Sequence, residues 1–152
     1  MKEFGLLSNK ILRHIAKHFN EIKTMTPAQL SLFTLIYTSD EMRAAFEINK
    51  EGTHLEKLEF YLVKNIDLFN VQEFSLICNT IQAEINNNDS IKFDTLLENS
   101  SSNVISWLSN DDITSVKDLI HITNAYIVRS SKVKLPLRFF ELVELTALKL
   151  ST

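Results

Sequence analysis

The stretch Met25-Thr26-Pro27-Ala28-Gln29-Leu30 carries the strongest structural signal in this sequence, because it is typical of the start of an α-helix. Thr26 is a favourable N-cap, since its side-chain oxygen can accept a hydrogen bond from a backbone N–H of the first turn. Gln29 can bond back to the cap residue and complete a capping box, and Pro27 loses no hydrogen bond at the first helical position. The apolar residues at both ends of the stretch occupy the two positions of a hydrophobic staple.

The same order of residue types recurs at Phe69–Phe74 and at Leu108–Ile113, with Asn70 and Ser109 as the predicted caps. An acidic residue three positions after each cap can close the box. The predicted caps are 44 and then 39 residues apart. Such spacing is typical of two-helix repeats, in which each helical hairpin buries its apolar face by stacking on its neighbour.

A first helix is expected before each cap. The polar run Asn99–Asn103 predicts a break or loop within the third of these helices, because Asn and Ser compete for backbone hydrogen bonds. A further helical segment is expected at Asp40–Ile48, and a last helix after Pro136. Apolar residues at helical spacing predict the first helix of the first unit and the first helix of the second unit. They are Leu12, Ile15, Phe19 and Ile22 in the first unit, and Leu55, Leu58, Leu62 and Ile66 in the second.

The second helix of the first and third units is apolar nearly all round, so we expect it to be buried on several sides. The sequence therefore predicts an all-α fold, a short right-handed stack of helical hairpins (α-solenoid-like) with about three and a half units. We expect one helical-repeat domain over residues 1–152. Its units cover roughly residues 8–50, 53–88, 90–131 and, as a partial unit, 136–152.

Composition excludes several protein classes. The chain has only two Gly and two Pro among 152 residues, too few for an all-β fold or for a glycine-rich nucleotide loop. Its single cysteine, Cys78, excludes an intrachain disulfide, and the apolar sequence around it predicts a buried thiol. We expect no membrane span and no secretory signal, whereas the basic amphipathic pattern of the first twenty or so residues is also found in mitochondrial presequences.

Charge is distributed unevenly along the chain. The formal net charge is −3, but residues 1–39 and 129–152 each carry +3, so the middle carries −9. Two basic ends and an acidic centre can face different partners, although a solvated surface of varying sign is an equal alternative. The candidates for RNA contact are Lys10, Arg13, Lys17, Arg129, Lys132, Lys134 and Arg138. Phe139 and Phe140, next to these last bases, are the only phenylalanines considered for base stacking.

No group of residues indicates catalysis. His14, His18 and Glu21 share a helical face but lack the context of a metal site. Asp111 and Asp112 are explained by a place in the first turn of a helix. His121 is expected to be packed or hydrogen-bonded. We therefore expect no catalytic residue, cofactor, bound metal or small-molecule substrate.

The chain resembles the organellar helical-repeat proteins of the octotricopeptide and heptatricopeptide type, which are related to the repeats of FAST-kinase-domain proteins. The residues that carry the resemblance are the helix openings 25–32 and 108–113 and the helix ending 119–126 followed by 137–142. The resemblance implies a place in mitochondria or chloroplasts, action on RNA and, for shortened members, incorporation into organellar ribosomes. This chain departs from the pattern in its net acidity, its few units and its lack of a terminal nuclease-like domain, which favours a bound subunit.

We therefore expect a non-catalytic structural subunit of a mitochondrial ribonucleoprotein, with the mitochondrial ribosome as the particle and rRNA and neighbouring proteins as contacts. The alternative is a protein-only adaptor, or an accessory subunit of another mitochondrial complex, that binds through the open last helix. An enzyme is the least favoured class.

Overall fold

The computed structural model describes residues 19–37, 53–87, 93–129 and 133–151. These residues form helices and no strand, which confirms the all-α class. The predicted segment Asp40–Ile48 and residues up to 18 lie outside the described residues. The elements are η1 (Phe19–Thr24), α2 (Pro27–Tyr37), α4 (Thr53–Lys64), η2 (Ile66–Leu68), α5 (Val71–Asn87), α6 (Asp94–Ser109), α7 (Val116–Val128) and α8 (Leu137–Leu150).

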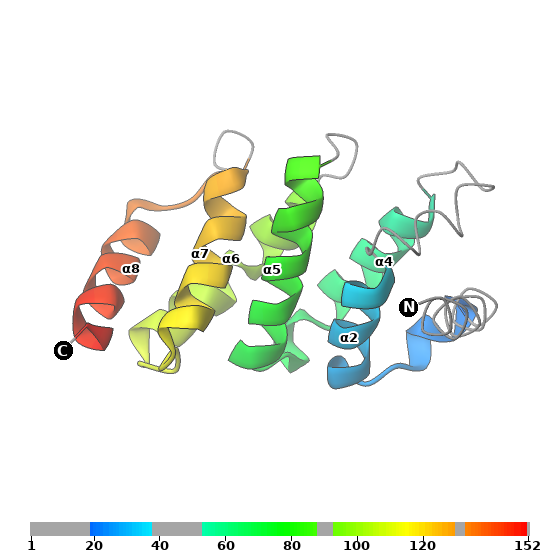
Figure 1. Cartoon of the computed structure of the whole chain (residues 1–152), viewed down its shortest axis with the longest axis horizontal. Helices are drawn as coiled ribbons and strands as arrows, with labels where there is room; N and C mark the ends of the chain where they lie inside the picture. The colour runs from blue at the N-terminus through cyan, green and yellow to red at the C-terminus, as the bar shows by residue number, and fades with distance from the viewer. Residues whose placement is uncertain (1–18, 38–52, 88–92, 130–132, 152) are drawn as a thin grey trace, which may run out of the picture.

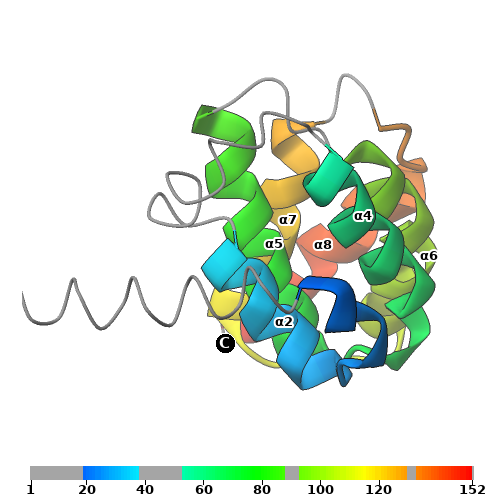
Figure 2. The same ribbon diagram turned by 90° about the vertical axis from the view of Figure 1, so that its right-hand side faces the viewer.

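The helices pack in two rows. Helices α2, α5 and α7 lie side by side in one row, with α5 packed between the other two (Figure 1). Helices α4, α6 and α8 form the second row, in which α6 contacts both α4 and α8. Figure 2, which looks along the rows, shows α2, α5 and α7 on one side and α4 and α6 on the other. Helix α8 contacts both α6 and α7 and lies at the C-terminal end of the molecule (Figure 1).

The first two predicted capping boxes are confirmed. The Thr26 backbone N–H donates to Gln29 Oε1 at 3.0 Å, and the Gln29 N–H donates to Thr26 Oγ1 at 3.2 Å. The Asn70 N–H likewise donates to Glu73 Oε1 at 3.0 Å, and the Glu73 N–H donates to Asn70 Oδ1 at 2.8 Å. Each box satisfies two backbone donors at the start of α2 or α5 that have no partner within the helix.

The third predicted cap is wrong, because Ser109 is the last residue of α6 rather than the start of the next helix. The Asp112 N–H donates to Trp107 O at 2.9 Å and the Asp111 N–H to Leu108 O at 3.4 Å. With Asp111 in the left-handed region at φ 59°, these bonds form a Schellman motif, which terminates a helix. Asp111 and Asp112 therefore do not lie in a first turn.

Helix α7 instead starts at Ser115, whose Oγ accepts from the Asp118 N–H at 3.5 Å. The caps of α2, α5 and α7 are thus Thr26, Asn70 and Ser115, and their spacings are 44 and 45 residues. This spacing is more regular than the predicted one.

The predicted break at Asn99–Asn103 is also wrong, because α6 is continuous from Asp94 to Ser109. The polar side chains bond back to carbonyls one turn earlier, as Asn99 Nδ2 does to Thr95 O at 2.7 Å and Ser101 Oγ to Glu98 O at 2.9 Å. Asn103 Nδ2 reaches Asp67 Oδ1 of η2 at 2.9 Å. The polar side chains that predicted a loop therefore form hydrogen bonds within α6 and to η2, and they do not interrupt the helix.

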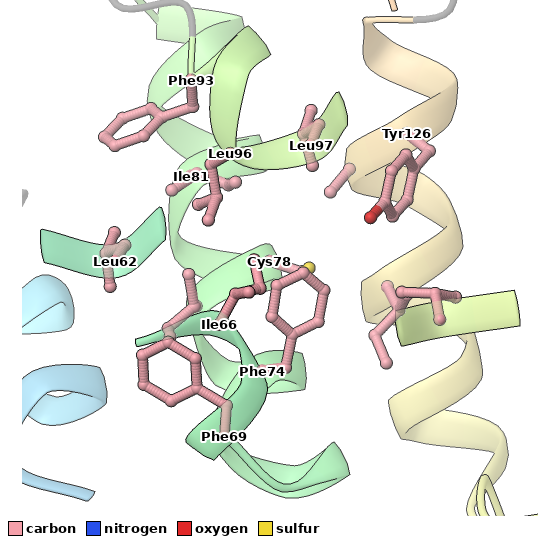
Figure 3. Close-up of a cluster of buried hydrophobic side chains, with 14 of the residues drawn as sticks. Leu62, Ile66, Phe69, Phe74, Cys78, Ile81, Phe93, Leu96, Leu97 and Tyr126 are labelled. Atoms are coloured by element: carbon pink, nitrogen blue, oxygen red, sulfur yellow. The ribbon is translucent and has the colours of Figure 1, made fainter. Parts of the chain in front are cut away.

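The core lies between the two rows. Figure 3 shows Phe74 and Cys78 of α5 on the side of the helix that looks toward Tyr126 of α7, with Ile81 of α5 close to Leu96 of α6 and Phe69 beside Ile66. Figure 3 labels further buried core residues: Leu62, Ile66, Phe93, Leu96 and Leu97. Each fully buried Leu, Ile or Phe side chain contributes roughly 1.5–3 kcal/mol relative to an exposed one.

We expected α2 and α7 to be buried on several sides, and each helix nevertheless exposes large apolar side chains on one side. Leu32 and Leu35 of α2 are exposed, and so are Val116, Ile120 and Ile127 of α7. In α7 the exposed side is one that neither α5 nor α8, the two helices with which it has most contacts, covers.

Candidate interaction surfaces

Helix α7 has an apolar face that no described helix covers. Val116, Ile120 and Ile127 are 51%, 48% and 53% exposed. They lie four and seven residues apart, so they share one face of the helix. The opposite side of α7 is closed, because Ile122, Ala125 and other core residues pack against the rest of the fold. We call the exposed residues Val116, Ile120 and Ile127 the α7 ridge.

The α7 ridge occupies positions that are covered in the preceding helix of the same row. Counted from their caps, Val116 and Ile120 correspond to Val71 and Ser75 of α5, which are both buried. Ser75 Oγ lies 3.3 Å from His121 Nδ1 of α7, so this face of α5 looks toward α7. Helix α7 thus contacts α5 at Ser75, the position that is occupied by the exposed Ile120 in α7 itself.

Helix α2 repeats the arrangement. Ser31, five residues after its cap, and Thr34, eight residues after it, are buried on the helix that packs against α5. The residue five positions after the cap is therefore a serine in the two helices where another helix follows, and it is Ile120 in α7.

Helix α8 exposes a second apolar surface. Its inner side is marked by the buried Phe139 and Thr146, which pack toward α6 and α7. The opposite side exposes large apolar side chains together with Glu141 and Glu144, and Arg138 lies at its edge. We call this surface the α8 outer face; its apolar members are Leu137, Phe140, Leu145 and Leu148.

The predicted RNA-contact residues do not form one patch. Arg129 is held inside the fold, because its Nε donates to Asp94 Oδ1 at 2.7 Å and its Nη2 to Asp94 Oδ2 at 2.8 Å. This bidentate pair ties the end of α7 to the start of α6. Lys134 and Arg138 are exposed and form no ion pair with any described residue. The remaining candidates, Lys10, Arg13, Lys17 and Lys132, lie outside the described residues.

The two aromatic residues beside these bases have different environments. Phe139 is fully buried and packs against Tyr126 with ring centroids 5.0 Å apart, so its predicted availability for base stacking is wrong. Phe140 is 45% exposed and belongs to the α8 outer face.

A polar cluster is enclosed between α5, α6 and α7. Ser100 Oγ lies 2.5 Å from Tyr126 OH and 3.2 Å from Leu97 O, and both Ser100 and Tyr126 are fully buried. Burial raises the pKa of the Cys78 thiol well above its ordinary range. Desolvation, and to a smaller extent the nearby Cys78, raise the pKa of the Tyr126 phenol far above its ordinary value, against a smaller lowering by Ser100. Both groups are therefore neutral and inaccessible, which suits packing and not nucleophilic chemistry.

The histidines and acids indicate no metal centre in the described part of the chain, where no three His, Cys, Asp or Glu side chains converge. His14 and His18 lie outside the described residues, and so does the side chain of Glu21. His121 is half-buried and bonded to Ser75, as predicted for a packed histidine.

The α7 ridge is the surface that sequence reasoning missed. The signal in the sequence that could have indicated it is the apolar pattern of α7. This helix carries apolar residues on more sides than one neighbouring helix can cover. The apolar pattern alone predicts burial, and it does not say whether the covering helix belongs to the same chain.

None of the described helices combines the length and the apolar character needed to cross a membrane. Comparison of the chain with known protein families, with curated proteins and with solved structures found no match.

Proposed function

We propose that this chain is a non-catalytic structural subunit of a mitochondrial ribonucleoprotein, and that this particle is the mitochondrial ribosome. The observation that carries a binding role is the exposure of large apolar side chains on both α7 and α8, in the α7 ridge and the α8 outer face. Large apolar patches on a small protein are typical of protein–protein contact sites. The resemblance to organellar helical-repeat proteins supports the mitochondrial setting.

The fold proposed for this role is a short right-handed stack of helical hairpins, in which α8 belongs to a partial last unit. The caps at Thr26, Asn70 and Ser115, spaced by 44 and 45 residues, support a repeat. The two rows of helices, each packed on the next of its row, also support it.

In this proposal rRNA contacts the turn that leads into α8. Lys134 and Arg138 are exposed there and can reach phosphate oxygens. Arg129 is assigned to holding the end of α7 through Asp94. Lys132, Lys10, Arg13 and Lys17 remain proposed contacts by sequence alone.

The test is a salt titration of binding to purified mitochondrial rRNA. The double variant Lys134→Glu, Arg138→Glu is expected to weaken binding and to reduce the slope of log K against log salt by about one for each phosphate that the protein no longer touches. The matched control is Lys64→Glu, Lys117→Glu, which changes the net charge equally at exposed sites on α4 and α7. Equal slopes for both double variants would remove the support for RNA contact.

The mitochondrial particle is tested separately by gradient sedimentation of a mitochondrial extract. The chain is expected to travel with ribosomal particles at physiological salt. If no fraction that contains ribosomal particles also contains the chain, the proposed place in the mitochondrial ribosome is contradicted.

A protein-only adaptor of another mitochondrial complex is the second candidate. The exposed apolar surface favours it equally, because that surface needs a protein partner and no RNA. The two candidates differ in one observable: ribonuclease treatment releases a subunit that is held by RNA, whereas a protein-only adaptor stays in its complex.

A further inference from the structure

We propose that the α8 outer face is a docking site for one helix of a partner protein, in which two lysines or arginines, about one turn apart, stand between two apolar residues. This inference rests on the proposed binding role, and it names the surface and the chemistry of the partner. The residues that select this partner are Leu137, Glu141, Glu144 and Leu148, which we call the α8 seam.

The α8 seam runs along the open side of the helix. Its residues follow one another at intervals of four, three and four positions, so they line one face of α8. All are exposed, with Leu137 at 73% and Leu148 at 59%. The buried Phe139 and Thr146 lie on the opposite side, where the Phe139 ring packs against Tyr126 of α7. The seam therefore faces away from the fold, and a partner can reach all of it.

Two further apolar side chains widen this surface. Phe140 lies one turn after Leu137 and Leu145 one turn before Leu148, on the two sides of the seam. They are 45% and 54% exposed. A helix that packs along the seam also covers its flanks, because packed helices contact each other through neighbouring rows of side chains. Its burial of these apolar side chains supplies the favourable free energy of docking.

The two glutamates at the centre of the seam select the chemistry of the partner. Glu141 and Glu144 are exposed and form no ion pair with any described residue. Lysine or arginine at the centre of the partner helix can pair with both carboxylates, while its apolar stem packs on the leucines. An apolar centre would instead take the carboxylates out of water without a partner.

The bases of α8 do not neutralise this centre. Arg138 and Lys149 are eleven residues apart and lie along one edge of the face, and Lys149 Nζ donates to Asp111 Oδ1 at 2.8 Å. The carboxylates of the seam repel the phosphates of RNA. The partner at this face is therefore a protein, separate from the RNA contact proposed at Lys134 and Arg138.

The order of residues in the seam disfavours a second copy of this chain. Leucine, glutamate, glutamate, leucine reads the same in both directions. A symmetric pair of α8 helices that joins the leucines of two copies, parallel or antiparallel, therefore also joins their glutamates. Such like-charge contact is unfavourable, whereas a helix with lysines at the two central positions matches the whole seam.

The test uses the whole protein and two fluorescent synthetic helices of about five turns. The basic probe carries leucine, lysine, lysine and leucine at the spacing of the seam, with alanine and glutamine elsewhere, and the acidic probe carries glutamates in place of the lysines. Fluorescence anisotropy at physiological salt measures the Kd. The acidic probe is expected to bind at least tenfold more weakly than the basic probe.

Variants locate the binding on the seam. Glu144→Lys and Leu148→Gln are each expected to weaken binding of the basic probe about fivefold. The double variant Glu141→Lys, Glu144→Lys is expected to reverse the preference, so that the acidic probe binds at least tenfold more tightly than the basic one. This reversal is a gain of binding, which an unfolded or merely damaged protein cannot produce.

Matched controls separate the site from general charge and from general adhesion of apolar probes. Glu98→Lys makes the charge change of Glu144→Lys at an exposed acid of α6. Leu68→Gln repeats Leu148→Gln at a leucine of η2 that is 65% exposed. Both controls are expected to leave the Kd unchanged, and circular dichroism checks that every variant remains folded.

Four outcomes overturn the inference. They are no saturable binding of the basic probe up to about 1 mM, equal binding of the two probes, no reversal by the double variant, and equal effects of the seam variants and their controls. A dimer in analytical ultracentrifugation that Leu148→Gln converts to a monomer also overturns it, because a second copy then covers the seam. If the probes behave as expected but the chain never sediments with ribosomal particles, the proposed mitochondrial place fails and the docking site stands.

Discussion

The hydrogen bond between Ser100 of α6 and Tyr126 of α7 gives a sharp prediction about what holds these helices together. The two oxygens are 2.5 Å apart and both residues are fully buried. Ser100 Oγ also bonds Leu97 O at 3.2 Å, so Ser100 keeps a partner if the tyrosine hydroxyl is removed. Among the described residues, Ser100 is the hydrogen-bond partner of the Tyr126 hydroxyl. Removing the Ser100 hydroxyl therefore leaves the Tyr126 hydroxyl without a partner.

This asymmetry sets the magnitudes. Tyr126→Phe deletes one buried hydrogen bond and is expected to lower the free energy of unfolding by about 1 kcal/mol. Ser100→Ala leaves a phenol hydroxyl buried without a partner and is expected to cost about 2–3 kcal/mol. The double variant contains no orphan group and is expected to cost less than Ser100→Ala alone, by about 1 kcal/mol.

The assay is urea unfolding followed by circular dichroism at neutral pH, with equal m-values as the check for two-state behaviour. Ser101→Ala is the matched control, because Ser101 bonds only the Glu98 carbonyl of its own helix at an exposed site. It is expected to be neutral within about 0.5 kcal/mol. If Ser100→Ala costs no more than Ser101→Ala, or if Tyr126→Phe makes the Ser100→Ala variant less stable, the reasoning from the buried pair is refuted.

Four further predictions concern stability and are checked by the same urea unfolding. Because folding raises the pKa values of Tyr126 and Cys78, their contribution is complete below the unfolded values and is lost as pH rises, from about 8.5 for the thiol and about 10 for the phenol. The slope is about 1.4 kcal/mol per pH unit per group, and Tyr126→Phe removes the tyrosine's share, which begins near pH 10, and leaves that of Cys78. Arg129→Gln breaks the bidentate pair with the Asp94 carboxylate and is expected to cost about 1–2 kcal/mol, which a solvent-facing RNA contact would not. Asn70→Ala removes a capping box and is expected to cost about 1 kcal/mol, whereas an unchanged midpoint contradicts its role. Asp111→Gly is expected to be neutral or to stabilise by up to about 1 kcal/mol, because glycine adopts the left-handed φ of 59° without strain; a loss of stability would show that the exposed bridge to α8 matters more.

Local hydrogen bonding explains which parts of the fold were predictable. The boxes at Thr26 and Asn70 join residues three positions apart, so the sequence contains every participant. Ser109 was misassigned because Ser, Asn and Asp occur at both ends of helices. The left-handed conformation of Asp111, with the bonds from Asp111 and Asp112 back to α6, identifies this stretch as a helix end. The true cap, Ser115, lacks the apolar residue that precedes the other two caps, since Thr114 stands in that place.

Tertiary contacts explain what the sequence could not predict. Arg129 looked like a solvated base because its partner, Asp94, is 35 residues earlier in the chain. Ser100 suggested a loop, although its hydroxyl is satisfied by Tyr126, 26 residues later. The sequence predicts burial for the residues of the α7 ridge, because apolar periodicity shows which faces of a helix are apolar. It does not show how many neighbouring helices cover those faces.

The burial of Cys78 gives this protein an internal reporter. It is the chain's single thiol, and it is fully enclosed on α5, the helix flanked on both sides within its row. A thiol reagent therefore reads out one event, the separation of α5 from its neighbours, without any engineered probe. When reclosing is faster than modification, the labelling rate gives the free energy of that opening. A ligand bound to α7 can therefore be followed through the rate at which the Cys78 thiol is modified.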